Sequence, residues 1–184
     1  TADPSVVTTN GIDGWPPASD ISSTAAIVME TSTNTVLYSK NADQALYPAS
    51  AVKVMTCLVA LENSSLDDQV TMTATGVSGV TDGGANISSQ LDEVFTVEQC
   101  LYAIMVASAN DIALQVAEHV GGSVDAFVQT MNTRAQELGC TNTVFTNPTG
   151  LPDENQHTTA HDMALIMEAA MANETFRTIA ATTS

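Results

Sequence analysis

Pro48-Ala49-Ser50-Ala51-Val52-Lys53 opens the stretch that decides the fold, a run over 50–62 that is apolar at nearly every helical turn. This pattern predicts a helix that is buried on most of its sides. Ser50 and Lys53 stand three positions apart, so a helix places the hydroxyl and the amine on one face, within reach of each other. Such a pair can act as a nucleophile with its base. The alternative is a helix-capping serine followed by a surface lysine.

The composition is that of a soluble globular chain with few cations. The 184 residues are 44% hydrophobic, which supports one domain with a real core. Asp and Glu number 21 against four Lys and Arg, and the formal net charge is −17. Phosphate backbones and anionic lipid heads repel such a surface, so nucleic acid is excluded as a partner. No apolar run is long enough to predict a membrane span.

Three cysteines, Cys57, Cys100 and Cys140, each lie in an apolar context. Their number is odd, and neither Cys-x-x-Cys nor Cys/His ligand spacing occurs. The sequence therefore predicts three buried thiols, with no disulfide, metal or cofactor.

The chain is expected to divide into a flexible lead-in over 1–23 and a folded part over 24–184. The lead-in is rich in Thr, Ser, Pro and Gly and lacks periodicity. Residues 25–29 and 35–38 are strand-like, and the segment between them has the composition of a turn. One β-hairpin is predicted here, and no other strand pair.

Helices dominate the remainder after an irregular, polar stretch over 74–92. Thr96 with Gln99 has the pattern of a capping box at the start of a helix. Three more helices are predicted, from about Asp111, from Ser123 to a stop at Gly139, and from about Thr159 to Ala172.

The corner between the first two of these helices reads Ser108-Ala109-Asn110-Asp111. A Ser-x-Asn pattern is weak alone, because Ser32-Thr33-Asn34 and Ser39-Lys40-Asn41 match it too. Only Ser108 follows the helix of Ser50 and lies between two helices. Its alternative role is a capping box with Asp111.

Ser50-x-x-Lys53 followed by Ser108-x-Asn110 resembles the penicillin-binding and β-lactamase superfamily of serine acyltransferases. The flanking sequence is similar to that of the D-alanyl-D-alanine carboxypeptidases, the low-molecular-mass penicillin-binding proteins. The resemblance covers roughly residues 25–175, in order and in register. The matching stretches include Asn41-Ala42-Asp43, Lys53-Val54-Met55-Thr56, Ser108-Ala109-Asn110-Asp111, Phe145-Thr146-Asn147-Pro148 and His157-Thr158-Thr159-Ala160.

The resemblance implies an α+β fold of the β-lactamase/transpeptidase type, with a helical subdomain and the N-terminal hairpin of an antiparallel sheet. It implies that Ser50 is the nucleophile, Lys53 the general base, Ser108 a proton relay, and Asn110 a group that positions Lys53 and the substrate. The implied reaction removes the terminal D-Ala from cell-wall peptides ending in D-Ala-D-Ala, through an acyl-enzyme that β-lactams also form. The implied location is outside the cytoplasm, in the envelope of a bacterium.

One family motif, Lys-Thr/Ser-Gly on the strand beside the nucleophile, has no match, since no lysine follows Lys53. The substrate carboxylate needs a cation, Lys53 must be neutral as a base, and Lys40, Arg134 and Arg177 lie beside no motif. We therefore expect these residues to hold the acylation half of a site, without the carboxylate-binding half or the C-terminal strands of the sheet. A lone hairpin leaves an open edge, where a further segment or another chain is expected to pair.

Two alternatives stay open. One is a peptidoglycan-binding or scaffolding module that keeps the fold without turnover. The other is a class A-like β-lactamase, which would need a glutamate that the run Asn147-Pro148-Thr149-Gly150-Leu151 does not contain. His157 and His161 are expected to have structural roles near a helix start, and Asp162 is read as a helix N-terminal charge.

Overall fold

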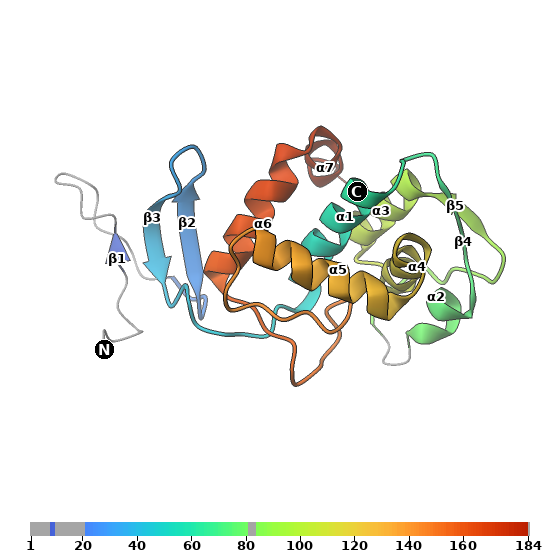
Figure 1. Cartoon of the computed structure of the whole chain (residues 1–184), viewed down its shortest axis with the longest axis horizontal. Helices are drawn as coiled ribbons and strands as arrows, with labels where there is room; N and C mark the ends of the chain where they lie inside the picture. The colour runs from blue at the N-terminus through green and yellow to red at the C-terminus, as the bar shows by residue number, and fades with distance from the viewer. Residues whose placement is uncertain (1–7, 10–20, 81–83, 184) are drawn as a thin grey trace.

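The computed structural model describes residues 8–9, 21–80 and 84–183, and shows a helical body with a small antiparallel sheet at one side (Figure 1). Within these residues, no helix is long and apolar enough to cross a membrane. The elements, in chain order, are β1 (Thr8–Thr9), β2 (Ala26–Glu30), β3 (Thr35–Lys40), the 3₁₀ turn η1 (Ala49–Ala51), α1 (Val52–Asn63), β4 (Gln69–Thr71), α2 (Ala74–Gly79), β5 (Val94–Thr96), α3 (Val97–Ala107), α4 (Asn110–Gly121), α5 (Val124–Glu137), α6 (Ala160–Ala172) and α7 (Glu174–Ala180).

The hairpin of β2 and β3 confirms the strand prediction. The Glu30 carboxylate accepts hydrogen bonds from the backbone N–H groups and the hydroxyls of Ser32 and Thr33, which closes the turn. These donors lower the pKa of Glu30 to about 2. Strand β1, inside the expected lead-in, pairs antiparallel with β3, so the sheet order is β1-β3-β2. In the part of the chain that the structure describes, β2 pairs on one side only. Residues 1–7 and 10–20 of the lead-in, Trp15 included, lie outside the described residues.

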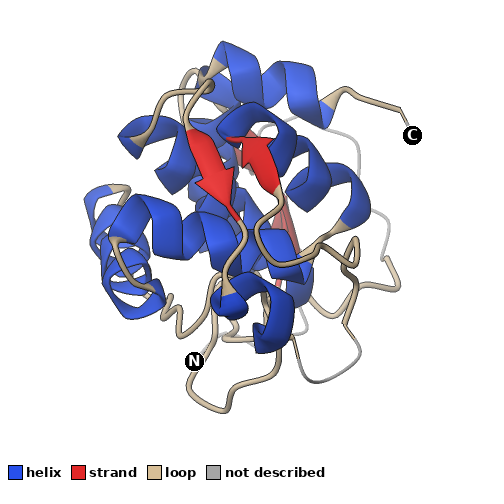
Figure 2. Cartoon of the chain, turned by 90° about the vertical axis from the view of Figure 1, so that its right-hand side faces the viewer, coloured by secondary structure: helices blue, strands red, loops and turns tan. Residues whose placement is uncertain are grey.

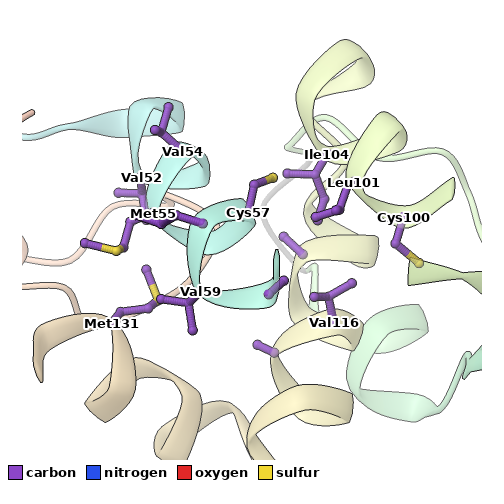
Figure 3. Close-up of a cluster of buried hydrophobic side chains, with 14 of the residues drawn as sticks. Val52, Val54, Met55, Cys57, Val59, Cys100, Leu101, Ile104, Val116 and Met131 are labelled. Atoms are coloured by element: carbon purple, nitrogen blue, oxygen red, sulfur yellow. The ribbon is translucent and has the colours of Figure 1, made fainter. Parts of the chain in front are cut away.

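Helix α1 forms the centre of the core, as its apolar pattern predicts. Every residue from Val52 to Ala60 is buried, and α3, α4, α5 and α6 all pack on this helix. Figure 3 shows Val59 of α1 beside Met131 of α5, with Leu101 and Ile104 on the α3 side. The three cysteines are buried and free, as expected. Ser50 therefore stands at the start of the most buried helix of the chain.

A second strand pair, β4 with β5, shows that the expectation of a single pair was wrong. The two strands appear as short arrows against the helices in Figure 2. They have only three residues each, too few to show alternation. The segment after β4, expected to be irregular, contains α2, which Thr73 caps by accepting from the N–H of Thr75.

The later helices begin and end close to the predicted positions. Thr96 and Gln99 form the capping box of α3, Ser123 caps α5, and Thr159 caps α6. The short helix α7 was not predicted, and its N-cap residue Asn173 is also the C-cap of α6. The α+β class is confirmed.

Candidate active site

Ser50 lies in the 3₁₀ turn that leads into α1. The residue before it, Ala49, has a left-handed φ of 47°, which a residue with a side chain rarely adopts. Ser50 is exposed, whereas Lys53, one turn further on, retains only 3% of its accessible surface. Lys53 Nζ and Ser50 Oγ are 3.4 Å apart. The helix thus presents an accessible hydroxyl beside a buried amine.

Ser108 reaches the same place from the end of α3. It is the C-cap residue of that helix and has a left-handed φ of 54°. Its Oγ lies 3.1 Å from Ser50 Oγ, although 58 positions separate the two serines. A cavity of about 220 Å³ lies over this triad, with Val54, Ile104 and Met105 as its apolar wall. The structure therefore brings together three of the four predicted site residues.

Burial of Lys53 lowers its pKa to about 8, because the charged form loses hydration. The nearby Cys57 thiol, one turn further along α1, partly offsets this effect. The Lys53 ammonium donates a hydrogen bond to the backbone carbonyl of Thr149. Lys53 is thus aimed at Ser50 and is partly neutral near physiological pH.

The turn over 147–151 contributes to the site through backbone atoms, which sequence reasoning missed. Besides the Thr149 carbonyl on Lys53, the Pro148 carbonyl accepts a hydrogen bond of 2.7 Å from Thr56 of α1. Gly150, with φ of 82°, lies so close to η1 that a Cβ there would come within 2.0 Å of the Ala49 carbonyl oxygen. Only glycine satisfies both the conformation and the approach.

Side-chain amides shape this turn. Asn147 Oδ1 accepts hydrogen bonds from the N–H groups of Thr149 and Gly150, and Asn147 Nδ2 donates to the Leu151 carbonyl. Gln156, 2% exposed, accepts from the N–H groups of Thr146 and Asn147. An Asn followed by Pro and Gly signals a turn, but nothing in the sequence indicates that the Thr149 carbonyl of this turn faces Lys53.

Asn110 is the first residue of α4 and is 4% exposed. Its N–H donates to the Ala85 carbonyl at 2.8 Å. Its Oδ1 is buried without a hydrogen-bond partner among the described residues, and the structure records no hydrogen bond from Asn110 to Lys53. A Cβ on Gly84 would come within 2.4 Å of Asn110 Nδ2, so the loop backbone covers this amide closely. The unpartnered oxygen is an acceptor that a ligand N–H or Lys53 can use.

Asp111 holds the neighbouring loop and does not cap with Ser108. Its carboxylate accepts hydrogen bonds from the N–H and hydroxyl of Ser89, at 3.1 and 2.8 Å, and from the N–H of Ile87 at 3.3 Å. Because the carboxylate is only 3% exposed, these donors satisfy a charge that water does not reach. Asp111 thereby fixes the loop that covers Asn110.

The histidines make contacts remote from this cluster. His161 Nδ1 lies 3.0 Å from an oxygen of Asp43, and His157 Nδ1 lies 2.9 Å from the Asn155 carbonyl oxygen. Asp162, in the first turn of α6, accepts a hydrogen bond of 2.8 Å from the N–H of Asn142. No group of three or more His, Cys, Asp or Glu side chains within 8–9, 21–80 and 84–183 is arranged to hold a metal ion.

Comparison with known proteins gives consistent matches. A family model described as D-alanyl-D-alanine carboxypeptidase matches residues 13–184. Among curated proteins, D-alanyl-D-alanine carboxypeptidase DacF of Bacillus subtilis is 37% identical over 155 residues, which cover 82% of this chain and 39% of that protein. DacB2 of Mycobacterium tuberculosis is 36% identical over 160 residues, which cover 84% of this chain and 53% of that protein.

Solved structures give the same result. The crystal structure of a D-alanyl-D-alanine carboxypeptidase from Mycobacterium tuberculosis matches with a TM-score of 0.85 and 32% identity, over 92% of this chain and 64% of that one. DacD from Francisella tularensis matches with a TM-score of 0.82 and 32% identity, over 91% and 42%. The chain thus spans about two fifths to two thirds of the proteins named here.

Proposed function

Because this chain belongs to the D-alanyl-D-alanine carboxypeptidase family, we propose that its Ser50 is the nucleophile of a serine D,D-carboxypeptidase. The substrate is a cell-wall peptide ending in D-Ala-D-Ala, and the place of action is the bacterial cell envelope, after export. The observation that carries the proposal is the position of the Ser50 hydroxyl, 3.4 Å from Lys53 Nζ and 3.1 Å from Ser108 Oγ.

The pKa of Lys53 supports its role as the base. With a pKa of about 8, about a tenth of the Lys53 side chains are neutral at pH 7. Neutral Lys53 takes the proton from Ser50 as Oγ bonds to the carbonyl carbon of the penultimate D-Ala. The bond from that carbon to the terminal D-Ala nitrogen then breaks, and the proton passes through Ser108 to this leaving amine. Water hydrolyses the ester, and penicillin forms an ester at the same serine oxygen by opening its lactam ring.

Asn110 positions the substrate in this proposal. Its amide is buried beside the Ser108 corner, and its Oδ1 has no donor among the described residues. An unsatisfied buried acceptor costs about 1–3 kcal/mol. A peptide N–H, or Lys53 in its charged state, satisfies it during the reaction.

The open edge of β2 belongs to the same proposal. The terminal carboxylate of the substrate needs a cation, yet Arg134 pairs with Glu62 at 2.8 Å, Arg177 donates to carbonyl groups at the end of α6, and Lys40 lies on β3. We propose that a further strand pairs with β2 and brings the carboxylate-binding group. A scaffolding module that binds cell-wall peptide without turnover is the alternative if this group is absent.

Incubation with penicillin, followed by intact-mass measurement and peptide mapping, tests the proposal. We expect one adduct per chain on Ser50, none in Ser50→Ala, and labelling slowed by orders of magnitude in Lys53→Ala at neutral pH. Ser78→Ala, which changes an exposed serine of α2, is the matched control and should label like the wild type. Equal labelling of the wild type and Ser50→Ala, or no labelling of a chain shown to be folded, would contradict the proposal.

A further inference from the structure

Two successive carbonyl groups of the turn over 147–151 are bound by side chains of α1. The Pro148 carbonyl accepts a hydrogen bond of 2.7 Å from the Thr56 hydroxyl, and the next carbonyl, that of Thr149, accepts one from the Lys53 ammonium. Thr56 follows Lys53 by three positions in the helix, so both side chains lie on the face that the turn covers. The turn is therefore attached to α1 at two points, and only one of them uses the proposed base.

The Thr56 hydroxyl gives its proton to the turn and not to its own helix. A threonine inside a helix can bond to the carbonyl four residues earlier, and that carbonyl, of Val52, lies 3.5 Å from Thr56 Oγ1. The Pro148 carbonyl oxygen is nearer, at 2.7 Å. Because a hydroxyl has one proton to donate, the shorter contact takes it.

The contact between Thr56 and Pro148 is closed to water. Thr56 is 0% exposed, Thr149 is 1% exposed, and Pro148 is buried as well. If the hydroxyl is removed, no water replaces it as a donor, and the Pro148 carbonyl is left without a partner. Thr56 does not line the cavity over Ser50, so its hydroxyl acts on the site only through the turn.

The Thr149 carbonyl determines how the neutral amine of Lys53 is turned. A neutral amine has two N–H groups and one lone pair. While one N–H stays on the Thr149 carbonyl, the lone pair can accept the proton of the Ser50 hydroxyl, whose oxygen is 3.4 Å from Lys53 Nζ. Without this acceptor the amine is free to donate to Ser50 Oγ instead, and that arrangement does not remove the proton.

We propose that Thr56 is a positioning residue for the acylation of Ser50, because its hydroxyl holds the Pro148 carbonyl and thereby keeps the Thr149 carbonyl on Lys53. The inference rests on the proposed function, in which Lys53 is the base. It assigns a role in the reaction to a side chain that contacts none of the reacting atoms. A threonine that served only to fill space could be replaced by valine without an effect on Lys53.

Penicillin labelling of variants in α1 tests this role. Thr56→Val replaces the hydroxyl with a methyl group of similar size, and Thr56→Ser keeps the hydroxyl. At pH 9, where most Lys53 side chains are neutral, we expect labelling to be about tenfold slower in Thr56→Val and within about twofold of the wild type in Thr56→Ser. Val59→Ala, which removes buried packing beside Met131 (Figure 3), controls for lost stability and should label like the wild type.

The two lysines of the chain allow a second measurement that needs no reaction. Protein labelled with ¹³C at the lysine ε-carbon gives one NMR signal for Lys53 and one for Lys40. In Thr56→Val the Lys53 ammonium loses its acceptor, so its signal should titrate at lower pH than in the wild type, whereas Thr56→Ser should keep the wild-type midpoint. Cys57, the titratable neighbour that acts on Lys53, is unchanged in these variants, and no acid lines the cavity over Ser50. The Lys40 signal, from β3, should stay the same throughout.

The outcomes separate this role from the proposed function. Labelling of Thr56→Val at the wild-type rate, a loss that Thr56→Ser or Val59→Ala shares, or an unmoved Lys53 signal would overturn the role of Thr56 and leave the function standing. If the folded wild type is not labelled at Ser50, the proposed function fails, and the Lys53 signal alone decides whether Thr56 holds the turn. Should Thr56→Val not fold, Thr56→Ala removes the same hydroxyl and takes its place.

Discussion

The ammonium of Lys53 donates a hydrogen bond to the backbone carbonyl of Thr149, 96 positions further along the chain. This contact joins α1, which follows the proposed nucleophile Ser50, to a turn whose shape depends on Asn147 and Gly150. The environment of Lys53, the proposed base, is therefore set by a segment that contributes no proposed catalytic side chain.

The rate of penicillin labelling should follow the ionisation of Lys53. Because burial lowers the pKa of Lys53 to about 8, the neutral fraction rises about tenfold per pH unit below that value. We expect the labelling rate to rise with this slope from pH 6 and to level off above pH 8. A rate that does not change between pH 6 and 8 would contradict the role of Lys53 as the base.

Lys53 should also make stability depend on pH. Its pKa falls on folding from 10.5 to about 8, so between these values the unfolded chain binds more protons and the free energy of unfolding rises with pH. Lys53→Met removes this dependence. Lys53→Met should have a higher free energy of unfolding than the wild type. This difference should be constant below pH 8 and then shrink, by up to about 3 kcal/mol, as pH approaches 10.5. Denaturant titrations at several pH values measure the difference in the free energy of unfolding between the two proteins. A difference that stays constant up to pH 10.5 would contradict the lowered pKa of Lys53.

Two glycines with left-handed backbones, Gly139 and Gly150, allow the cost of the backbone conformation to be measured apart from the cost of a steric clash. Gly139 has φ of 86° and open space around an added Cβ, whereas an added Cβ on Gly150 would meet the Ala49 carbonyl oxygen at 2.0 Å. We expect Gly139→Ala to cost about 1–2 kcal/mol in the free energy of unfolding. Gly150→Ala should cost several kcal/mol more and slow the labelling of Ser50. Equal losses of unfolding free energy in the two variants would show that Gly150 does not pack closely against η1.

Asp111→Asn should loosen the loop over Asn110. The amide keeps only one acceptor oxygen for the donors from Ile87 and Ser89, so we expect a loss of about 2 kcal/mol and slower labelling of Ser50. Asp125→Asn changes an exposed acid in the first turn of α5 and should cost only a few tenths of a kcal/mol. Thermal unfolding and penicillin labelling of both variants provide the measurement. Equal effects of the two substitutions would show that Asp111 contributes only as a negative charge at the start of its helix.

The three cysteines should be inert in the folded protein. Burial raises the pKa of Cys100 and of Cys140 to about 12, and raises that of Cys57 further. Since the thiolate is the reactive form, a colorimetric thiol reagent should detect no thiol at pH 8 and three thiols in denaturant. Rapid reaction of one thiol in the native protein would show that its helix opens locally.

The elements that the sequence predicted are those with a local signal. The signals are the apolar stripe of α1 and the helix caps at Thr96, Ser123 and Thr159. In each signal the interacting residues lie within a few positions of one another, so the pattern and the structure agree. Strands β4 and β5 were missed because their pairing joins segments about 25 positions apart and each is three residues long.

In the candidate site, too, the groups that the sequence marks by residue type were predicted, and those that depend on tertiary packing were missed. Ser50, Lys53 and Ser108 could be proposed because their side chains carry the chemistry, and the structure brings them together. The carbonyl of Thr149 could not be proposed, because every residue has a carbonyl and only tertiary packing selects this one. The spacing of Ser108 and Asp111 offered a capping box as an alternative, whereas the Asp111 carboxylate accepts from Ile87 and Ser89, which lie more than 20 positions earlier.

The left-handed backbones of Ala49 and Ser108, with φ of 47° and 54°, also bear on how the protein can be engineered. Each such conformation stores about 1–3 kcal/mol when the residue is not glycine, so selection for thermostability alone would replace both residues with glycine. At position 108 that exchange removes the hydroxyl of the proposed relay, and at position 49 it gives more conformational freedom to the peptide next to Ser50. The most heat-resistant sequence for this backbone is therefore not its most reactive one.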